Sequence, residues 1–185
     1  MKKQALNQTP VFSPGILLCA KAQARKAQNR PPQPRSTRKA RRAAKMIRNI
    51  ATENGGWLIP DYWHPDEHTT PHLSLNHQLA ECLALYHAAD LLNRKDLRAL
   101  ADRMLLAIVD TGSGWVMPNH NLYYSIKPDG TYVEGDYPYL TYNDLYDLRK
   151  YLSSSERPEL ETLTYLMGEK LQWMQNNGVT GYEKG

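Results

Sequence analysis

Two apolar-patterned segments, separated by a break of four residues, constrain the fold of this chain more than any other feature. Residues 74–93 carry apolar side chains at helical spacing, and Leu97 to Ile108 repeats them at i, i+3, i+4, i+7, i+8 and i+11. The break is "NRKD", residues 93–96. Helices joined by so short a connection pack antiparallel. The sequence therefore predicts a helical hairpin.

A β-hairpin is expected at "LYYSIKPDGTYV", residues 122–133. Pro128 sets the backbone angle that a turn needs, Asp129 favours turns, and Gly130 accepts a positive φ. The apolar and aromatic residues on either side are typical of two short strands.

Two more helices are expected toward the C-terminus. Thr141 is predicted to cap one that carries Leu145, Leu148 and Leu152, with Asp144 at its third position as half of a capping box. A last helix should run from about Pro158 to Asn176 and end at Gly178. The predicted fold class is mainly α: a helical hairpin plus further helices with one small β-hairpin, preceded by a basic N-terminal arm.

The N-terminal arm is predicted to contain a tail followed by a helix. Residues 1–34 show little periodicity, and a helix should begin near Ser36 or Thr37 and end at Gly55–Gly56. Its apolar stripe consists mainly of alanine, and its other faces are basic. We therefore expect two domains: a basic arm over residues 1–54 that ends in this amphipathic helix, and an acidic, mostly helical globular domain over residues 55–185.

Charge is strongly segregated along the chain. Residues 1–48 contain 13 Lys or Arg and no Asp or Glu, and the first acidic residue is Glu53. Residues 49–185 contain 10 basic and 19 acidic residues. Such asymmetry indicates contact with a polyanion, and nucleic-acid phosphates are the commonest one. The predicted phosphate-binding residues are Arg35, Arg38, Lys39, Arg41, Arg42, Lys45 and Arg48.

Other interpretations of the arm stay open. It could be a solvated segment, bind an acidic protein, or lie on the chain's own acidic domain until nucleic acid competes for it. Membrane binding is not expected, because an alanine stripe lacks the Trp, Phe or Leu that interfacial helices bring.

Tyrosine is concentrated in one stretch, residues 121–148, which holds seven of the 12 tyrosines, while the whole chain has one Phe. A buried hydroxyl needs a hydrogen-bond partner, so a core usually takes Phe or Leu. Tyrosine-rich surfaces suit the face of a sugar, a base or a protein partner, although half-buried packing would also use these rings. The residues expected on a partner or sugar surface are Tyr123, Tyr124, Tyr137, Tyr139 and Tyr142.

The same stretch resembles a known family. Tyr124 on the predicted strand, then Asp136–Tyr137, then Asn143-Asp144-Leu145 resemble the C-terminal region of the glucuronyl epimerases, which invert carbon five of uronic acids in heparan-type polysaccharides. The resemblance covers residues ~75–175, and Pro138 stands where the family has His. It implies that the helical hairpin is a unit of an α/α-toroid. It also implies that Tyr124 and Tyr137 face the uronate as catalytic residues in proton exchange, which requires a lowered tyrosine pKa.

No metal site and no cofactor are predicted. His64, His68, His72 and His77 lie close in sequence, but Pro65 and Pro71 interrupt any regular helix that would align them. "TGSGW", residues 111–115, lacks the Lys and the spacing of a phosphate-binding loop.

The cellular compartment is inferred from weak signals. Cys19 and Cys82 give no disulfide framework, which is typical of a reducing compartment. Pro14 and Gly15 interrupt the apolar patch that a secretion signal would need, and "NRPPQPR" is unlike a transit peptide. We expect a cytoplasmic, non-enzymatic accessory protein that binds DNA or RNA phosphates through its arm and a protein partner through its tyrosines. The alternative is a carbohydrate-active or sugar-binding protein related to the uronyl epimerases.

Overall fold

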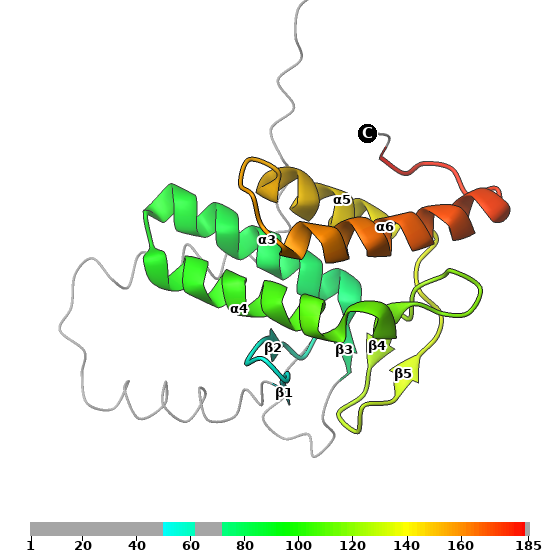
Figure 1. The fold of residues 1–185 in the computed structure, drawn as a ribbon, viewed down its shortest axis with the longest axis horizontal. Coiled ribbons are helices and arrows are strands. Elements are labelled where there is room, and N and C mark those ends of the chain that lie inside the picture. Colours follow the sequence, from blue (N-terminus) through cyan, green and yellow to red (C-terminus); the bar gives the residue numbers. More distant parts are fainter. Residues whose placement is uncertain (1–49, 62–71, 184–185) are drawn as a thin grey trace, which may run out of the picture. The chain divides into compact units, whose positions relative to one another are not determined.

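The computed structural model describes residues 50–61 and 72–183. The chain divides into two units, Met1–Arg41 and Arg42–Gly185, and every described residue belongs to the second. The arm residues predicted to bind phosphate, the tail and the start of the predicted basic helix therefore lie outside the described residues. The described part is mainly helical, with short strands at one side (Figure 1).

The helical hairpin predicted at residues 74–108 is confirmed. Helix α3 (Leu75–Leu92) ends at Asn93, whose φ is 49°. The chain then reverses direction into α4 (Lys95–Thr111). The two helices pack antiparallel along most of their length (Figure 1). Their contact is close enough that the thiol of Cys82 donates to the carbonyl of Ala101 over 3.4 Å. A short 3-10 turn, η1 (Gly112–Trp115), continues from α4.

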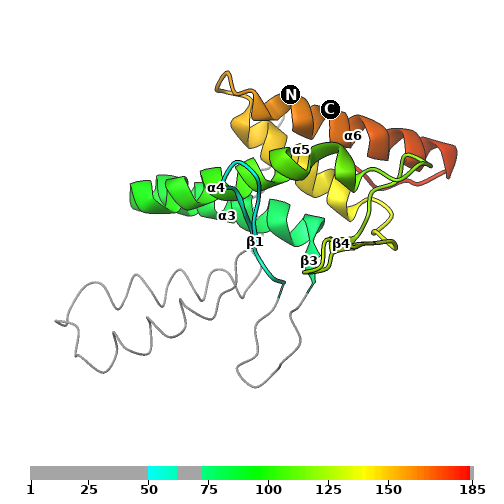
Figure 2. The same cartoon turned by 60° about the horizontal axis from the view of Figure 1, so that its bottom comes forward.

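A second pair of helices lies on the first. Helix α5 (Leu140–Leu152) packs on α3, and α6 (Glu159–Asn176) packs on α5 and α4. Figures 1 and 2 show the two pairs as neighbouring layers. Both predicted C-terminal helices are thus confirmed. None of the helices in the described part of the chain is long and apolar enough to cross a membrane.

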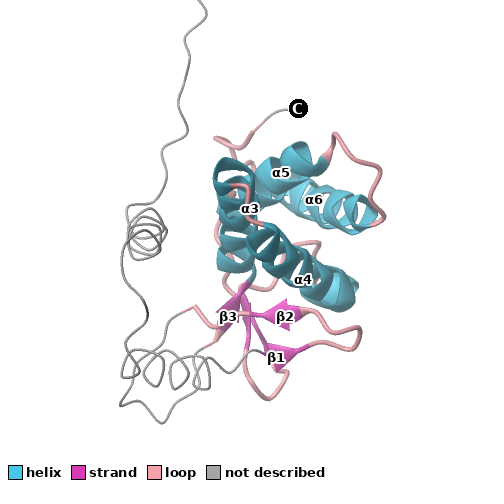
Figure 3. Cartoon of the chain, turned by 90° about the vertical axis from the view of Figure 1, so that its left-hand side faces the viewer, coloured by secondary structure: helices cyan, strands magenta, loops and turns pink. Residues whose placement is uncertain are grey.

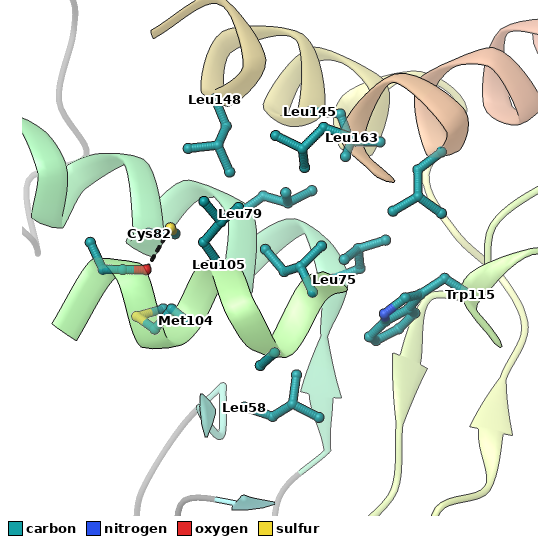
Figure 4. Packing of buried hydrophobic residues seen from close by; sticks show 14 of the residues in the cluster. Leu58, Leu75, Leu79, Cys82, Met104, Leu105, Trp115, Leu145, Leu148 and Leu163 are labelled. Atoms are coloured by element: carbon teal, nitrogen blue, oxygen red, sulfur yellow. Dashed lines mark hydrogen bonds between the residues drawn. The ribbon is translucent and has the colours of Figure 1, made fainter. Parts of the chain in front are cut away.

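The core lies between these two helix pairs and extends toward the strands. Figure 4 shows Leu79 and Leu105 on the first pair facing Leu145, Leu148 and Leu163 on the second. Trp115 closes one end of this cluster and is fully buried, with its indole N–H donated to Thr111 Oγ1 over 2.7 Å. Each leucine buried in this way stabilises the folded state by about 1.5–3 kcal/mol.

Two small antiparallel sheets lie on the opposite side of the α3–α4 hairpin from α5 and α6 (Figure 3). One pairs β1 (Ile50–Ala51) with β2 (Trp57–Leu58). The other has the order β3–β4–β5, formed by Leu73–Ser74, Ser125–Ile126 and Tyr132–Val133. The predicted β-hairpin is β4–β5, and Gly130 at its turn has a φ of 85°. Sequence analysis did not predict β1, β2 or β3.

Residues 50–56 are not helical, so the prediction of a helix reaching Gly55–Gly56 is wrong at its C-terminal end. Ile50 pairs with Leu58 and Ala51 with Trp57, across a turn in which Gly55 has a φ of 85°. The Oγ1 hydroxyl of Thr52 and the side-chain amide of Asn54 both donate to Asp110 near the end of α4. Bonds to α4 thus outweigh local helix propensity, and the hairpin straddles the boundary predicted between residues 54 and 55.

The start of α5 also differs from the prediction. The helix begins at Leu140, and Thr141 lies inside its first turn, where it is fully buried and its hydroxyl donates to Asp136 Oδ1. No side chain caps the helix, so the capping roles predicted for Thr141 and Asp144 are wrong. Because the helix already begins at Leu140, Thr141 does not occupy the capping position, and its hydroxyl donates to Asp136 instead.

Glycine substitutions test the contact between the β1–β2 hairpin and α4. A Cβ on Gly56 would lie 2.6 Å from Ala107 Cα in α4, whereas nothing lies within 4 Å of a Cβ on Gly168 in α6. Gly56→Ala should lower the free energy of unfolding by about 1–3 kcal/mol through overpacking. Gly168→Ala should raise it by about 1 kcal/mol, because alanine favours a helix interior. Urea denaturation measures the free energy of unfolding of both variants. If Gly56→Ala were as stable as the unaltered protein, the close packing of Gly56 on α4 would be contradicted.

Candidate functional site

A polar cluster forms where the β3–β4–β5 sheet meets the beginning of α3. Asp61 follows β2, and His72 immediately precedes β3. Tyr124 precedes β4, and its carbonyl accepts the N–H of Leu75 over 3.1 Å, which brings strand and helix together. We call Asp61, His72, His77, Tyr124 and Tyr137 the His–Tyr cluster.

Asp61 is the buried carboxylate of this cluster. Its side chain is 4% exposed, and Oδ2 lies 3.1 Å from His72 Nε2 and 3.4 Å from His77 Nδ1. Its Oδ1 accepts the backbone N–H of Ser74 over 2.8 Å. Among the described residues Oδ2 makes no hydrogen bond of ordinary geometry, so the two imidazoles are its electrostatic partners.

Tyr124 lies beside His72 and Tyr137. Its hydroxyl is 3.4 Å from His72 Nε2, and its ring centre is 5.5 Å from the imidazole and 5.8 Å from the edge-on ring of Tyr137. Burial raises the pKa of Tyr124, and Tyr137 and Asp61 raise it further. The phenol is therefore protonated at neutral pH. It can donate a hydrogen bond, but it does not have the lowered pKa that the epimerase resemblance requires of a tyrosine base.

Glu81 lies one helical turn beyond His77 on α3. Burial raises the pKa of its carboxyl, while His77 opposes the rise. Two carboxyl groups, two imidazoles and two phenols thus gather at one end of α3. This arrangement can accept hydrogen bonds from hydroxyl groups and can donate hydrogen bonds to them.

The structure separates the five tyrosines predicted to share a surface. Tyr137 and Tyr139 are exposed, at 44% and 40%, and Tyr124 is half-buried beside Tyr137. Tyr123 packs on Tyr132, with ring centres 5.1 Å apart, against the core. Tyr142 is 5% exposed and is covered by Tyr182, so its place on the predicted surface is wrong. The first residues of α5 turn Tyr142 inward and leave Tyr139 outside.

A buried ammonium group fixes the position of Tyr137. Lys170 of α6 is fully buried, and its Nζ donates to Asp136 Oδ2, to Asn121 Oδ1 over 2.7 Å and to the carbonyl of Tyr137 over 2.8 Å. Burial lowers the pKa of Lys170 and raises that of Asp136, and each opposes the other's shift by its charge. Because one side chain joins three segments, the loop after β5 has a single defined path.

Two sets of predicted residues cannot be compared with the structure. The phosphate-binding candidates from Arg35 to Arg48 lie outside the described residues, and so do His64 and His68. Within residues 50–61 and 72–183, no three His, Cys, Asp or Glu side chains form a group able to hold a metal ion.

Comparison with known proteins does not decide between the candidate functions. No protein-family model matches the chain, and no curated protein or solved structure is significantly similar to it. The resemblance to the glucuronyl epimerases therefore stays a prediction.

Sequence analysis missed the role of Asp61 and the pairing of His72 with Tyr124. His72 and His77 were noticed as members of a histidine-rich stretch, but Pro71 removed the helical spacing that would have aligned them. Asp61 follows Pro60 in a loop and shows no pattern of its own. The sequence does contain an isolated acid, a group of histidines and a tyrosine-rich strand. Only the pairing of β3 with β4 brings His72 beside Tyr124.

Asp144, one turn into α5, makes stability depend on pH. Burial raises the pKa of its carboxyl to about 7, and Asp147 and Asp136 add to the rise. Between pH 4 and 7 the folded protein holds a proton that the unfolded chain releases, so stability falls as pH rises. Asp144→Asn should raise the free energy of unfolding at pH 8 by about 2 kcal/mol, and this gain should vanish near pH 4.

The measurement is urea denaturation at several pH values between 4 and 8. Glu156→Gln, an exposed substitution beyond the end of α5, serves as the control and should change little. A gain from Asp144→Asn that is independent of pH would contradict the assigned cause.

Proposed function

We propose that this protein binds nucleic acid through its basic N-terminal arm, while its folded unit serves as an acidic, partner-binding module. The observation that carries the proposal is the segregation of charge. The first 48 residues hold 13 of the 23 Lys and Arg residues and no acid, and all 19 acids follow. The positive charges of such a segment repel one another. Binding to a polyanionic partner offsets this repulsion and accounts for the concentration of charge.

The folded unit supports the proposal because several of its cations already have partners. Arg94 pairs with Asp96, Arg98 with Asp90, and Arg157 with Asp102. Lys170 is buried against Asp136. These four cations are therefore less available to phosphate than cations that have no acidic partner. Binding by such an arm neutralises phosphates and releases counterions, which gives affinity with little dependence on base sequence.

Neutralising the arm tests the proposal while keeping every residue of the described part of the chain. Truncation before Gly55 is unsuitable, because it removes the bonds from Thr52 and Asn54 to Asp110. A full-length variant with Arg38, Arg41, Arg42 and Lys45 changed to Gln should bind duplex DNA and RNA more weakly. The slope of log K against log salt should fall by about 3–4, because each phosphate that is no longer neutralised lowers it by roughly 0.9.

The matched control changes four exposed cations of the folded unit, Lys95, Arg103, Lys127 and Lys150, to Gln. It should leave the salt slope unchanged. Fluorescence anisotropy at several salt concentrations measures both variants. If the unaltered protein shows no salt-dependent binding to DNA or RNA, or if the control loses as much slope as the arm variant, the proposal fails.

A second candidate function is saccharide binding at the His–Tyr cluster. It is favoured by one observation, the half-buried Tyr124, whose hydroxyl lies 3.4 Å from His72 Nε2 while its ring adjoins the exposed ring of Tyr137. A ring face beside hydrogen-bonding groups suits the apolar face and the hydroxyls of a sugar. Because the pKa of Tyr124 is raised, the candidate is a binding site in which this phenol donates a hydrogen bond.

Tyr124→Phe tests this second candidate. Removing the hydroxyl should weaken the binding of a uronic-acid oligosaccharide about tenfold, as expected when one hydrogen bond to a charged or hydroxyl partner is removed. Titration followed by Trp and Tyr fluorescence gives the affinity. Tyr142→Phe removes a hydroxyl outside the cluster and should have no effect. Absence of any saccharide response in the unaltered protein would exclude this candidate.

A further inference from the structure

Exposed aromatic and aliphatic side chains follow one another in sequence just before and at the beginning of α5. Tyr137, Tyr139 and Leu140 are among the large apolar side chains that the described residues leave most exposed, at 44%, 40% and 40%. Pro138 between them is exposed as well. Neighbouring apolar side chains gathered on a surface mark an interaction site. We call residues 137–140 the tyrosine patch.

The backbone beneath the patch is held in place. Lys170 Nζ donates to the carbonyl of Tyr137 over 2.8 Å, and the N–H of Asn143 donates to the carbonyl of Tyr139 over 3.0 Å. Gly181 of the C-terminal segment lies against Tyr139, and a Cβ there would be 3.6 Å from Cε1. Because these contacts already order the backbone, a ligand loses little entropy by binding here.

Negative charge borders the patch. Leu140 and the exposed Asp147 are two helical turns apart and therefore share one face of α5. The N–H of Glu183 donates to Asn143 Oδ1 over 2.9 Å, which places this second exposed acid beside the same helix. Burial and the charge of Glu183 raise the pKa of Asp147, with Lys150 opposing the rise. A cationic ligand would relieve this repulsion.

Aromatic rings bordered by acids have the chemistry that receives an arginine-flanked, proline-rich segment. Such a segment forms a polyproline II helix without internal hydrogen bonds, so its proline rings pack between aromatic rings and its arginines meet carboxylates. This chain contains one, "RPPQPR" at residues 30–35, in which Pro31 and Pro34 have the spacing of recognised proline motifs.

The dimensions of the two partners agree. At roughly 3.1 Å per residue, Pro31 and Arg35 are about 12 Å apart in a polyproline II helix. At about 1.5 Å per residue, Leu140 and Asp147 are roughly 10 Å apart along α5. Pro31 can therefore contact Leu140 while Arg35 contacts Asp147.

We propose that the tyrosine patch binds residues 30–35 of this protein. The proposal builds on the partner-binding role proposed above for the folded unit, and it holds whether or not the arm binds nucleic acid. It gives Arg35 two competing partners, a carboxylate of the folded unit and a phosphate. Nucleic acid would then release the proline-rich segment from the patch.

The test uses a labelled peptide and full-length receptors. A fluorescein-labelled peptide spanning residues 28–37 is titrated into a full-length variant with Pro31 and Pro34 changed to Ala, whose own segment no longer competes. Adding Tyr139→Ala should weaken binding at least about tenfold, as for an aromatic anchor. Tyr165→Ala is the matched control, because Tyr165 on α6 is as exposed, at 44%, and should leave affinity within about twofold. The unaltered protein should bind the peptide more weakly than the receptor.

Three results would overturn the proposal: no binding to the receptor, equal binding by the Tyr139→Ala variant, or equal binding of a peptide in which both prolines are Ala. Thermal unfolding verifies that Tyr139→Ala is folded. Asp147→Asn is a second variant that alters only an exposed carboxylate, and it should weaken binding several-fold. Nucleic-acid binding by the same receptor is measured separately, so its loss would count against the proposed function and not against the patch.

Discussion

The half of the fold that carries the tyrosines depends on one buried cation. Lys170 reaches from α6 to the loop before β4 through Asn121, and to the segment after β5 through Asp136 and Tyr137. Removing an ammonium group from water is costly unless its hydrogen bonds are satisfied. Here a carboxylate, an amide oxygen and a carbonyl satisfy them, so the three segments have a defined arrangement. The exposure of Tyr137 and Tyr139 follows from it.

Much of the fold could be predicted because its signals are local. Apolar periodicity gave α3, α4, α5 and α6 nearly to their ends, and Pro128, Asp129 and Gly130 gave the β4–β5 turn. The failures share one cause, which is that contacts distant in sequence decided the outcome. Asp110 draws residues 52–54 into a turn. Lys170, 34 residues along the chain, holds the Asp136 carboxylate that accepts the hydroxyl of Thr141. Strands of two residues also leave too little pattern to detect.

The candidate site could be predicted only in part, for the same reason. The tyrosine-rich stretch pointed to Tyr124 and Tyr137, which the structure brings together. Their partner His72 lies 52 residues before Tyr124, and Asp61, in the loop after β2, lies 3.1 Å from His72 Nε2. Polar side chains in loops carry no periodicity, so neither the pairing nor the raised pKa of Tyr124 could be read from composition.

The folded unit and the arm divide the chemistry of the chain between them. Several acids of the folded unit bind its own arginines, whereas the cations of the first 48 residues have no acid within their own segment. The two parts of a chain divided in this way can bind different partners.

The β1–β2 hairpin has a mechanical consequence. It is the first described element of the chain, and it is fastened to α4 by the bonds from Thr52 and Asn54 to Asp110. Tension on the preceding chain is therefore taken first by a two-residue ladder and one carboxylate. These contacts would break before the force reached the helical core.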